Sequence, residues 1–153
     1  MDKAEIAAAG EPIFRDFLIA IVLNAQTAAE RLGMHLADVQ AVNLLAVTGP
    51  LPAGQLGQRL GLPTATTTRV IDRLERAGYV ERQRDPDDRR RVMVALDAER
   101  ASVVDAVFEP SRRHLSALMP HYTEAELRIL YDMFVRVTHA FRAATEEMRT
   151  APR

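Results

Sequence analysis

Arginine side chains are concentrated in one part of the 153-residue sequence. Between residues 59 and 91 the chain has nine arginines and six acidic residues, whereas the remainder has 11 basic and 15 acidic residues. A guanidinium binds phosphate oxygens, or the O6 and N7 atoms of guanine, through paired hydrogen bonds. A local positive excess within a chain of net charge −1 is typical of a surface that binds phosphate. This arginine cluster, residues 59–91, therefore indicates a nucleic acid as the partner.

The residue types that carry catalysis or bind metals show no comparable grouping. Cysteine is absent, which excludes disulfides, thiol nucleophiles and cysteine-ligated zinc. The histidines are never four residues apart and lie beside no group of carboxylates that would complete a metal site. No serine lies in a motif that activates a nucleophile, and the sequence has no glycine-rich phosphate loop. We therefore expect no enzymatic activity, no cofactor and no metal at His35, His114, His121 or His139.

A helix-turn-helix pattern positions part of the arginine cluster. Leu56 and Leu60 predict a short helix over residues 53–60, which ends at Gly61. A second helix is predicted over residues 64–77, with an apolar stripe formed by Thr67, Val70, Ile71 and Leu74. The side chains outside this stripe are available to a partner: Thr64, Ala65, Thr66, Thr68, Arg69 and Arg73. Small residues at the start of the helix allow close approach, and Arg69 is the strongest candidate for a contact with phosphate or guanine.

A β-hairpin is predicted directly after this helix. Residues 79–84 and 91–96 have the short period of strands, and the segment 85–90 between them is rich in turn formers and charges. Helix, turn, helix and hairpin in this order form a winged helix-turn-helix, whose second helix enters a DNA major groove about 12 Å wide. The hairpin, or wing, extends toward the neighbouring groove or the backbone. Duplex DNA is therefore the expected partner.

Long amphipathic helices flank this unit. Residues 12–32 and 36–47 have helical periodicity, and residues 98–118 have it with an interruption at Pro110, where we expect a kink or a restart. A capping box at Thr123 predicts the start of a last helix, whose stripe is Leu127, Leu130, Phe134, Val137 and Phe141. This stripe is either part of an intramolecular core or a dimer interface. A dimer is favoured because the small winged unit cannot cover both this stripe and the apolar residues within 13–22.

The sequence resembles the MarR (multiple antibiotic resistance) family of regulators. The resemblance is carried by the segments 60–62, 68–82, 85–90 and 94–96, with the flanking helices extending it over nearly the whole chain. The wing signature is Asp88-Arg89-Arg90, and the resemblance implies that Arg90 probes the minor groove while Asp88 helps to hold it. Arg89 belongs to the same group of expected DNA-binding residues. Three positions depart from the family pattern. Asp97 stands where the family often has a threonine or serine that caps the next helix, and it can serve as that cap. Pro63 stands at the usual N-cap of the second helix and moves the expected cap to Thr64, which itself replaces a basic residue found early in that helix in many members.

Together these features predict a mainly α-helical chain with a small β-hairpin wing. Residues 1–153 form one chain of this type, with a winged helix-turn-helix DNA-binding region at 36–97 and helical dimerisation regions at 11–33 and 98–149. The expected function is that of a DNA-binding transcriptional regulator, by preference a repressor, which binds a pseudo-palindromic duplex site as a homodimer. The alternative is a winged-helix module that binds proteins without specific DNA binding.

The resemblance also implies a small aromatic or amphipathic ligand between the winged region and the dimerisation helices. The candidate pocket residues are Phe17, Ile21, Leu45 and Phe108, although core packing explains the same four residues. No apolar run approaches the ~18 residues of a membrane span, and the N-terminal residues lack the apolar segment of a secretory signal. We therefore expect a cytoplasmic protein with no membrane partner.

Overall fold

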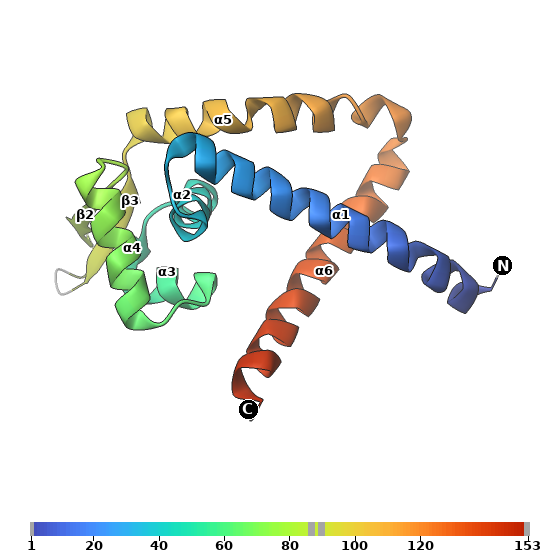
Figure 1. Cartoon of the computed structure of the whole chain (residues 1–153), viewed down its shortest axis with the longest axis horizontal. Helices are drawn as coiled ribbons and strands as arrows, with labels where there is room; N and C mark the ends of the chain where they lie inside the picture. Colours follow the sequence, from blue (N-terminus) through green and yellow to red (C-terminus); the bar gives the residue numbers. More distant parts are fainter. Residues whose placement is uncertain (1, 86–87, 89–90, 152–153) are drawn as a thin grey trace. The chain divides into compact units, whose positions relative to one another are not determined.

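The computed structural model describes residues 2–85, 88 and 91–151 (Figure 1). Within these residues the chain forms six α-helices, one short 3₁₀-helix and three strands. It divides into two compact units, Met1–Pro110 and Ser111–Arg153. The first unit contains the predicted winged region together with the N-terminal helix, and the second contains the C-terminal helix. The fold is therefore mainly α-helical with a small sheet, as the sequence predicts.

Helix α1 (Lys3–Leu32) begins well before the predicted start at residue 12. A capping box explains the early start, because the Asp2 carboxylate accepts hydrogen bonds from the backbone N–H groups of Ala4 and Glu5 at 2.8 and 2.9 Å. The Glu5 carboxylate accepts one in return from the N–H of Asp2 at 2.8 Å. The helix then continues through Pro12 and ends at Gly33, where the sequence predicts its end.

The winged region (residues 36–97) contains three helices and three strands. These are α2 (Leu36–Thr48), β1 (Leu51–Pro52), α3 (Ala53–Leu60), α4 (Thr64–Arg76), β2 (Val80–Arg84) and β3 (Val92–Leu96). β3 lies in the middle of the antiparallel sheet, with Val94 opposite Arg82 of β2 and Leu51 of β1. The sequence predicts β2 and β3 but not β1, because two residues are too few to show an alternating pattern.

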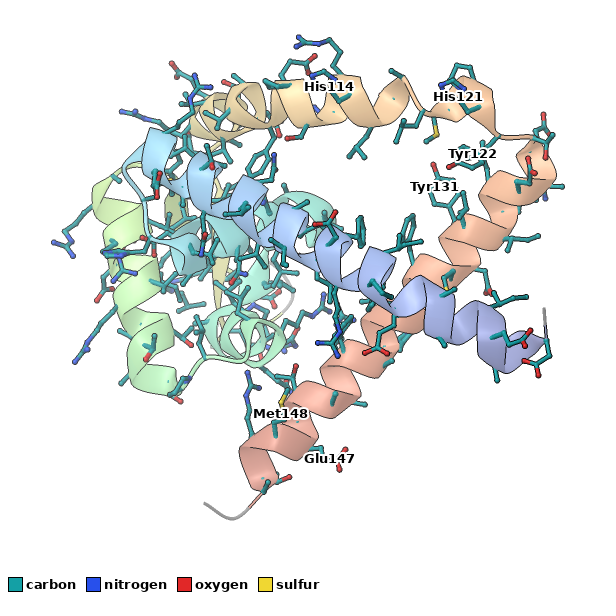
Figure 2. The ribbon with its side chains drawn as sticks, turned by 45° about the vertical axis from the view of Figure 1, so that its right-hand side comes forward. His114, His121, Tyr122, Tyr131, Glu147 and Met148 are labelled. Carbon is teal, nitrogen blue, oxygen red and sulfur yellow. The ribbon has the colours of Figure 1, made fainter. Side chains whose placement is uncertain are left out.

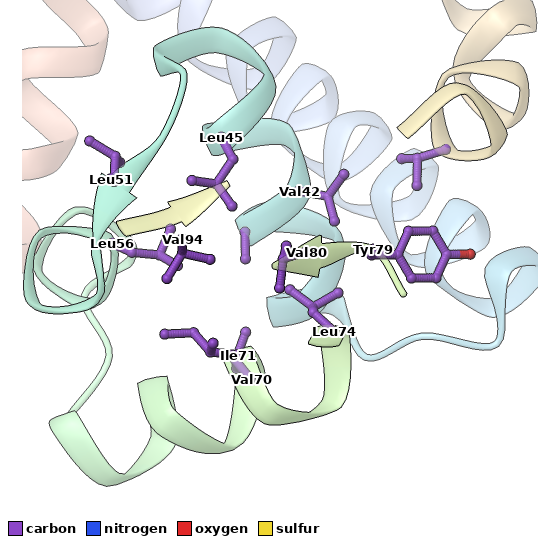
Figure 3. Close-up of a cluster of buried hydrophobic side chains, with 12 residues drawn as sticks. Val42, Leu45, Leu51, Leu56, Val70, Ile71, Leu74, Tyr79, Val80 and Val94 are labelled. Carbon is purple, nitrogen blue, oxygen red and sulfur yellow. The ribbon is translucent and has the colours of Figure 1, made fainter. Parts of the chain in front are cut away.

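One apolar cluster holds the winged region together (Figure 3). Val42 and Leu45 come from α2, Leu56 from α3, and Val80 and Val94 from the sheet. Helix α4 adds the stripe expected from the sequence, in which Val70, Ile71 and Leu74 are each 1% exposed. Burial of a side chain of this size stabilises the fold by about 1.5–3 kcal/mol. The stripe therefore fixes α4 on the core and turns the opposite face of that helix outward.

Helices α3 and α4 approach each other closely at Gly57. A Cβ atom at this position would lie 2.3 Å from Oγ1 and 3.0 Å from Cγ2 of Thr67. Thr67 is 4% exposed, and its hydroxyl donates a hydrogen bond to the Pro63 carbonyl at 3.1 Å. The chain turns between the two helices at Gly61, whose φ of 66° favours glycine. The absence of a side chain at Gly57 therefore sets the spacing of the helix-turn-helix.

Helix α5 (Ala98–Ser116) follows directly after β3. Asp97 caps it, because Oδ1 accepts a hydrogen bond from the backbone N–H of Arg100 at 2.8 Å. Val104 is 1% exposed and joins the core of the winged region. The helix continues through Pro110, so the restart expected there is wrong. Proline removes one backbone hydrogen bond, and the other bonds of the adjoining turns are enough to continue the helix.

The second unit contains the end of α5, the 3₁₀-helix η1 (Met119–His121) and α6 (Glu124–Thr150). Its capping box is confirmed: Thr123 Oγ1 accepts from the N–H of Glu126 at 3.3 Å, and Glu126 accepts from the N–H of Thr123 at 2.8 Å. The hydrogen bonds from Thr123, the backbone one first, hold the pKa of Glu126 below its ordinary value. Tyr131 of α6 donates a hydrogen bond to the Met119 sulfur at 3.8 Å, which links α6 to η1.

No helix in the described part of the chain is long and apolar enough to cross a membrane. Many large apolar side chains of α1 and α6 nevertheless remain exposed, since Ile13, Phe134 and Phe141 are 73%, 50% and 46% exposed, although Ala28 and Ala29 near the end of α1 are buried. Exposed apolar surface on this scale usually marks an interaction site. Each of the two helices therefore has a face that the single chain does not cover.

Candidate nucleic-acid interface

Helix α4 presents opposite faces to the core and to solvent. With about 3.6 residues per turn, four residues lie opposite the buried stripe and form what we call the outer row: Ala65, Arg69, Asp72 and Arg76. Ala65, Arg69 and Arg76 are exposed, and Asp72 is partly buried. The exposed Thr64 and Thr68 lie beside the row. The outward surface of α4 thus combines small residues at its start with guanidinium groups farther along.

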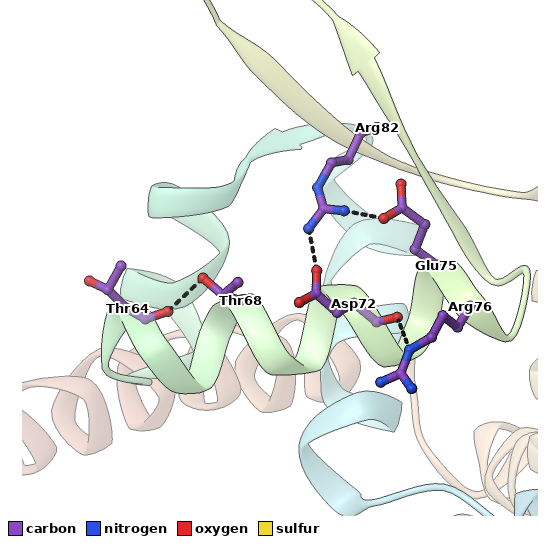
Figure 4. A network of polar contacts seen from close by, with 6 residues as sticks. All are labelled: Thr64, Thr68, Asp72, Glu75, Arg76 and Arg82. Atoms are coloured by element: carbon purple, nitrogen blue, oxygen red, sulfur yellow. Dashed lines mark hydrogen bonds and ion pairs between the residues drawn. The ribbon is translucent and has the colours of Figure 1, made fainter.

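The polar groups of this surface differ in which hydrogen bonds they can still make with a partner. Thr68 donates its hydroxyl hydrogen to the carbonyl of Thr64 at 3.0 Å, so its oxygen remains an acceptor (Figure 4). Arg76 donates from Nε to the Asp72 carbonyl at 3.1 Å. Arg69 has no hydrogen-bond or ion-pair partner within the part of the chain that the structure describes. Its guanidinium is therefore available in full to phosphate or to a base edge.

The first turn of α4 has no side-chain cap among the described residues. Pro63 is the N-cap residue, and the expected cap at Thr64 is wrong because Thr64 is already the first residue of the helix. The leading backbone N–H groups therefore point out of the helix end, where the helix dipole adds a partial positive charge. Phosphate oxygens bind well at such an end.

Arg73 lies on the flank of α4 that packs against α2. Its Nε and Nη2 donate hydrogen bonds to Oδ2 and Oδ1 of Asp38 at 3.0 and 2.6 Å. The Asp38 side chain is 5% exposed and that of Arg73 is 35% exposed. The hydrogen bond to Asp38 raises the pKa of Arg73, while burial lowers it by less. The sequence suggests that Arg73 is available to DNA; the structure gives it an intramolecular ion pair that attaches α4 to α2, and a contact with DNA stays a prediction.

A second arginine is paired on the other flank of α4. Arg82 of β2 donates from Nη2 to Oδ1 of Asp72 at 2.7 Å and from Nη1 to the Glu75 carboxylate (Figure 4). The arginine cluster therefore divides into paired and outward members. The exposed arginines of this cluster without an ion pair to another described residue are Arg59, Arg69, Arg76, Arg84 and Arg91.

The wing is closed by backbone contacts on either side of its tip. The N–H of Asp85 donates to the carbonyl of Arg91 at 3.0 Å, and the N–H of Arg91 donates to the carbonyl of Asp88 at 2.8 Å. Asp88 is exposed. Arg89 and Arg90 lie outside the described residues, so their expected contacts with DNA stay predictions.

The four candidate ligand residues do not share one environment. Leu45 is 2% exposed in the core of the winged region, and Phe108 packs partly buried against that core. Phe17 and Ile21 are 43% and 48% exposed on α1. A cavity of about 430 Å³ lies elsewhere, between the turn that joins α1 to α2 and the end of α4. The polar and aromatic residues that line it are His35, Asp38, Arg73, Arg76 and Tyr79, which are too far apart in sequence to form a recognisable motif.

The described part of the second unit contains no grouping of side chains that points to another chemistry. His114 and His121 belong to different elements, α5 and η1 (Figure 2). Among the residues that the structure describes, no three histidine, cysteine, aspartate or glutamate side chains are placed to hold a metal ion. The winged region therefore holds the strongest candidate site of the chain.

Comparison with known proteins gives the same region a consistent description. The MarR family model matches residues 36–92, which span the winged region from α2 to the start of β3. The HTH-type transcriptional regulator YcgE of Bacillus subtilis is 34% identical over 148 residues, covering 96% of each chain. The HTH-type transcriptional repressor YetL, also of Bacillus subtilis, is 27% identical over 88 residues, covering 55% of this chain and 53% of that one.

Solved structures show the same fold over nearly the whole chain. A MarR family protein from Bacillus stearothermophilus is similar with a TM-score of 0.68 and 22% sequence identity, covering 94% of this chain and 99% of that chain. At that identity the comparison bears on the fold alone. The agreement extends beyond the winged region to the long flanking helices, because the aligned part includes most of both chains.

Proposed function

Since the chain belongs to the MarR family and is a DNA-binding transcriptional regulator, we propose that it is a homodimeric repressor of a pseudo-palindromic duplex site. The observation that carries the proposal is the outer row of α4, which faces away from a tightly packed core. It includes Arg69, which has no ion-pair partner among the described residues. In this arrangement α4 enters the major groove, where Ala65 and the threonines allow close approach. Repression is proposed because the similar protein YetL is named a repressor.

Replacing Arg69 with alanine is expected to weaken DNA binding by about 1–3 kcal/mol, because a guanidinium bound to guanine or phosphate is lost. If Arg69 contacts a phosphate, the slope of log affinity against log salt should also become shallower by about 0.9. Fluorescence anisotropy at several salt concentrations, on a duplex that the wild-type chain selects from a random pool, measures both quantities. Arg128→Ala is a matched control, because it removes the same charge from α6, outside the winged region. Equal losses in the two variants would contradict the role of Arg69.

The homodimer is proposed to form through the apolar faces of α1 and α6. None of the residues of α6 is buried in the single chain, although the helix contains the stripe from Leu127 to Phe141. Two copies related by a twofold axis would bury the same faces on both chains. A dimer would also hold two α4 helices about 34–36 Å apart, the spacing of successive major grooves on one side of a duplex.

The Phe134→Asp variant is expected to sediment as a monomer at micromolar concentration, whereas the wild-type chain sediments as a dimer. Phe134 is 50% exposed in the single chain, so a carboxylate there is tolerated by one copy but is costly in an apolar interface. His139→Asp is the control, because helical periodicity places residue 139 on the opposite face of α6. A monomeric wild-type chain in sedimentation equilibrium would rule out this part of the proposal.

The proposal includes release of DNA by a small aromatic or amphipathic ligand. The cavity between the α1–α2 turn and the end of α4 supports it, because Arg73 and Arg76 of α4 are among its lining residues. A ligand in contact with α4 can change DNA binding only if it binds one position of that helix more tightly than another. The four residues suggested by the sequence, Phe17, Ile21, Leu45 and Phe108, do not line this cavity.

A further inference from the structure

The outer row of α4 contains a carboxylate at a place where a phosphate-binding surface should have none. Asp72 stands between Arg69 and Arg76, one turn from each, on the face proposed to meet DNA. Glu75 follows one turn later on the adjoining flank and is 38% exposed. Two uncompensated carboxylates on this surface would repel the phosphate backbone and weaken association. Their presence on α4 therefore requires a compensating partner.

That partner is Arg82 of β2. One guanidinium nitrogen donates to Oδ1 of Asp72 at 2.7 Å and the other donates to the Glu75 carboxylate, so a single planar group binds both acids (Figure 4). The backbone of Arg82 is paired with Val94 of β3, which is 0% exposed in the core. The guanidinium is therefore fixed to the sheet from which the wing extends, and it connects that sheet to α4.

We propose that Arg82 is a positioning residue for DNA binding, which neutralises Asp72 and Glu75 and fixes the angle between α4 and the wing without itself contacting DNA. The inference rests on the proposed function, since it concerns how the helix and the wing bind one duplex together. Fixing the two contacting elements before binding reduces the conformational entropy that is lost when both engage the DNA. Arg82 belongs to the arginine cluster that the count of charges predicts to bind phosphate. In this proposal it acts instead through Asp72 and Glu75 of α4.

The contribution of this ion-pair network to folding is small, because all three side chains are more than one third exposed to solvent. The effect of removing Arg82 should therefore appear in DNA binding rather than in thermal stability. A phosphate-contacting arginine and a positioning arginine also differ in how their removal changes the salt dependence of DNA binding. Loss of a phosphate contact makes the salt dependence of binding shallower, whereas loss of a positioning residue lowers affinity at an unchanged slope.

Three variants of the full chain test the proposal on a duplex selected by the wild-type protein. Arg82→Gln is expected to lower affinity about tenfold, at an unchanged melting temperature and an unchanged salt slope. Arg82→Lys is expected to recover part of the loss, because it keeps the charge without the planar fork. The double variant Asp72→Asn/Glu75→Gln is expected to bind more weakly than wild type although it removes two negative charges. Arg128→Gln in α6, outside the winged region, is the control for loss of one exposed positive charge.

The outcomes test two claims separately: that the chain binds duplex DNA, and that Arg82 positions α4 and the wing without contacting DNA. A slope that becomes shallower by about 0.9 in Arg82→Gln would show that Arg82 contacts phosphate, and tighter binding by the double variant would show that Asp72 and Glu75 only repel DNA. Either result would overturn the positioning role. Wild-type affinity in Arg82→Gln would overturn it as well. If the wild-type chain selects no duplex at all, the proposed function fails and the role of Arg82 falls with it. Weaker binding in both the single and the double variant at constant slope supports the proposal.

Discussion

Replacing Gly57 with alanine is expected to destabilise the chain and to abolish specific DNA binding. The added Cβ would lie 3.1 Å from Cβ of Thr67 as well as 2.3 Å from its hydroxyl oxygen, so rotation of the threonine side chain cannot relieve the contact. Overpacking in a closely packed core costs about 1–3 kcal/mol. The strain is relieved only if α3 and α4 move apart, and α4 is the helix proposed to enter the major groove. Circular dichroism melting and fluorescence anisotropy measure the two effects.

Gly54→Ala provides the matched control for Gly57→Ala. Gly54 lies in the same helix, and a Cβ atom there would have no neighbour within 4 Å. Alanine is favoured over glycine within a helix by about 0.5–1 kcal/mol, so this variant should be at least as stable as wild type and should bind DNA equally well. If Gly57→Ala behaves like Gly54→Ala in both assays, the close approach of α3 and α4 does not control the position of α4.

Replacing Arg73 with methionine is expected to lower the free energy of unfolding by about 1.5–3 kcal/mol, the range for hydrogen bonds to a charged group. The change leaves the carboxylate of Asp38, 5% exposed, without the guanidinium that binds both of its oxygens. Because this pair attaches α4 to α2, the variant should also bind DNA less tightly. Urea denaturation followed by circular dichroism measures the loss of stability.

A double-mutant cycle distinguishes a buried-charge effect from a simple loss of packing. Asp38→Asn removes the charge but keeps an oxygen that can accept the backbone hydrogen bond from His35, which Asp38 accepts at 3.3 Å. The double variant Asp38→Asn/Arg73→Met should therefore be more stable than Arg73→Met alone. Arg76→Met, on the outer row, should leave the unfolding curve close to wild type. A double variant no more stable than Arg73→Met would argue against an unpaired buried charge.

The helix-turn-helix could be predicted because its signals are local. The stripe of α4 repeats every three to four residues, and all four of its predicted members are buried. Gly61 and Gly33 end their helices as expected, since only the residues next to them decide this. β1 was missed because it consists of two residues, and the early start of α1 was missed because Gly10 and Pro12, residue types that often interrupt a helix, lie within it.

The ion pairs of the candidate interface could not be predicted in the same way. Counting charges treats all nine arginines of the cluster alike, whereas the structure directs Arg73 to Asp38 and Arg82 to Asp72 and Glu75. Asp38 lies 35 residues before Arg73, so no sequence spacing indicates the pair. Asp72 and Glu75 stand three residues apart on α4, and this was the one local signal that they could share a cation. The net positive charge available to DNA is therefore arranged by tertiary contacts.

Selection of duplexes from a random pool by the wild-type chain, followed by guanine methylation interference on the selected sequence, tests the central claim most directly. The account predicts one enriched pseudo-palindromic sequence. Methylation of guanine N7 in the major groove should block binding at two segments whose centres are about 10 base pairs apart, since one α4 helix occupies each. Enrichment of no sequence above the starting pool would contradict the claim that this chain recognises duplex DNA through α4.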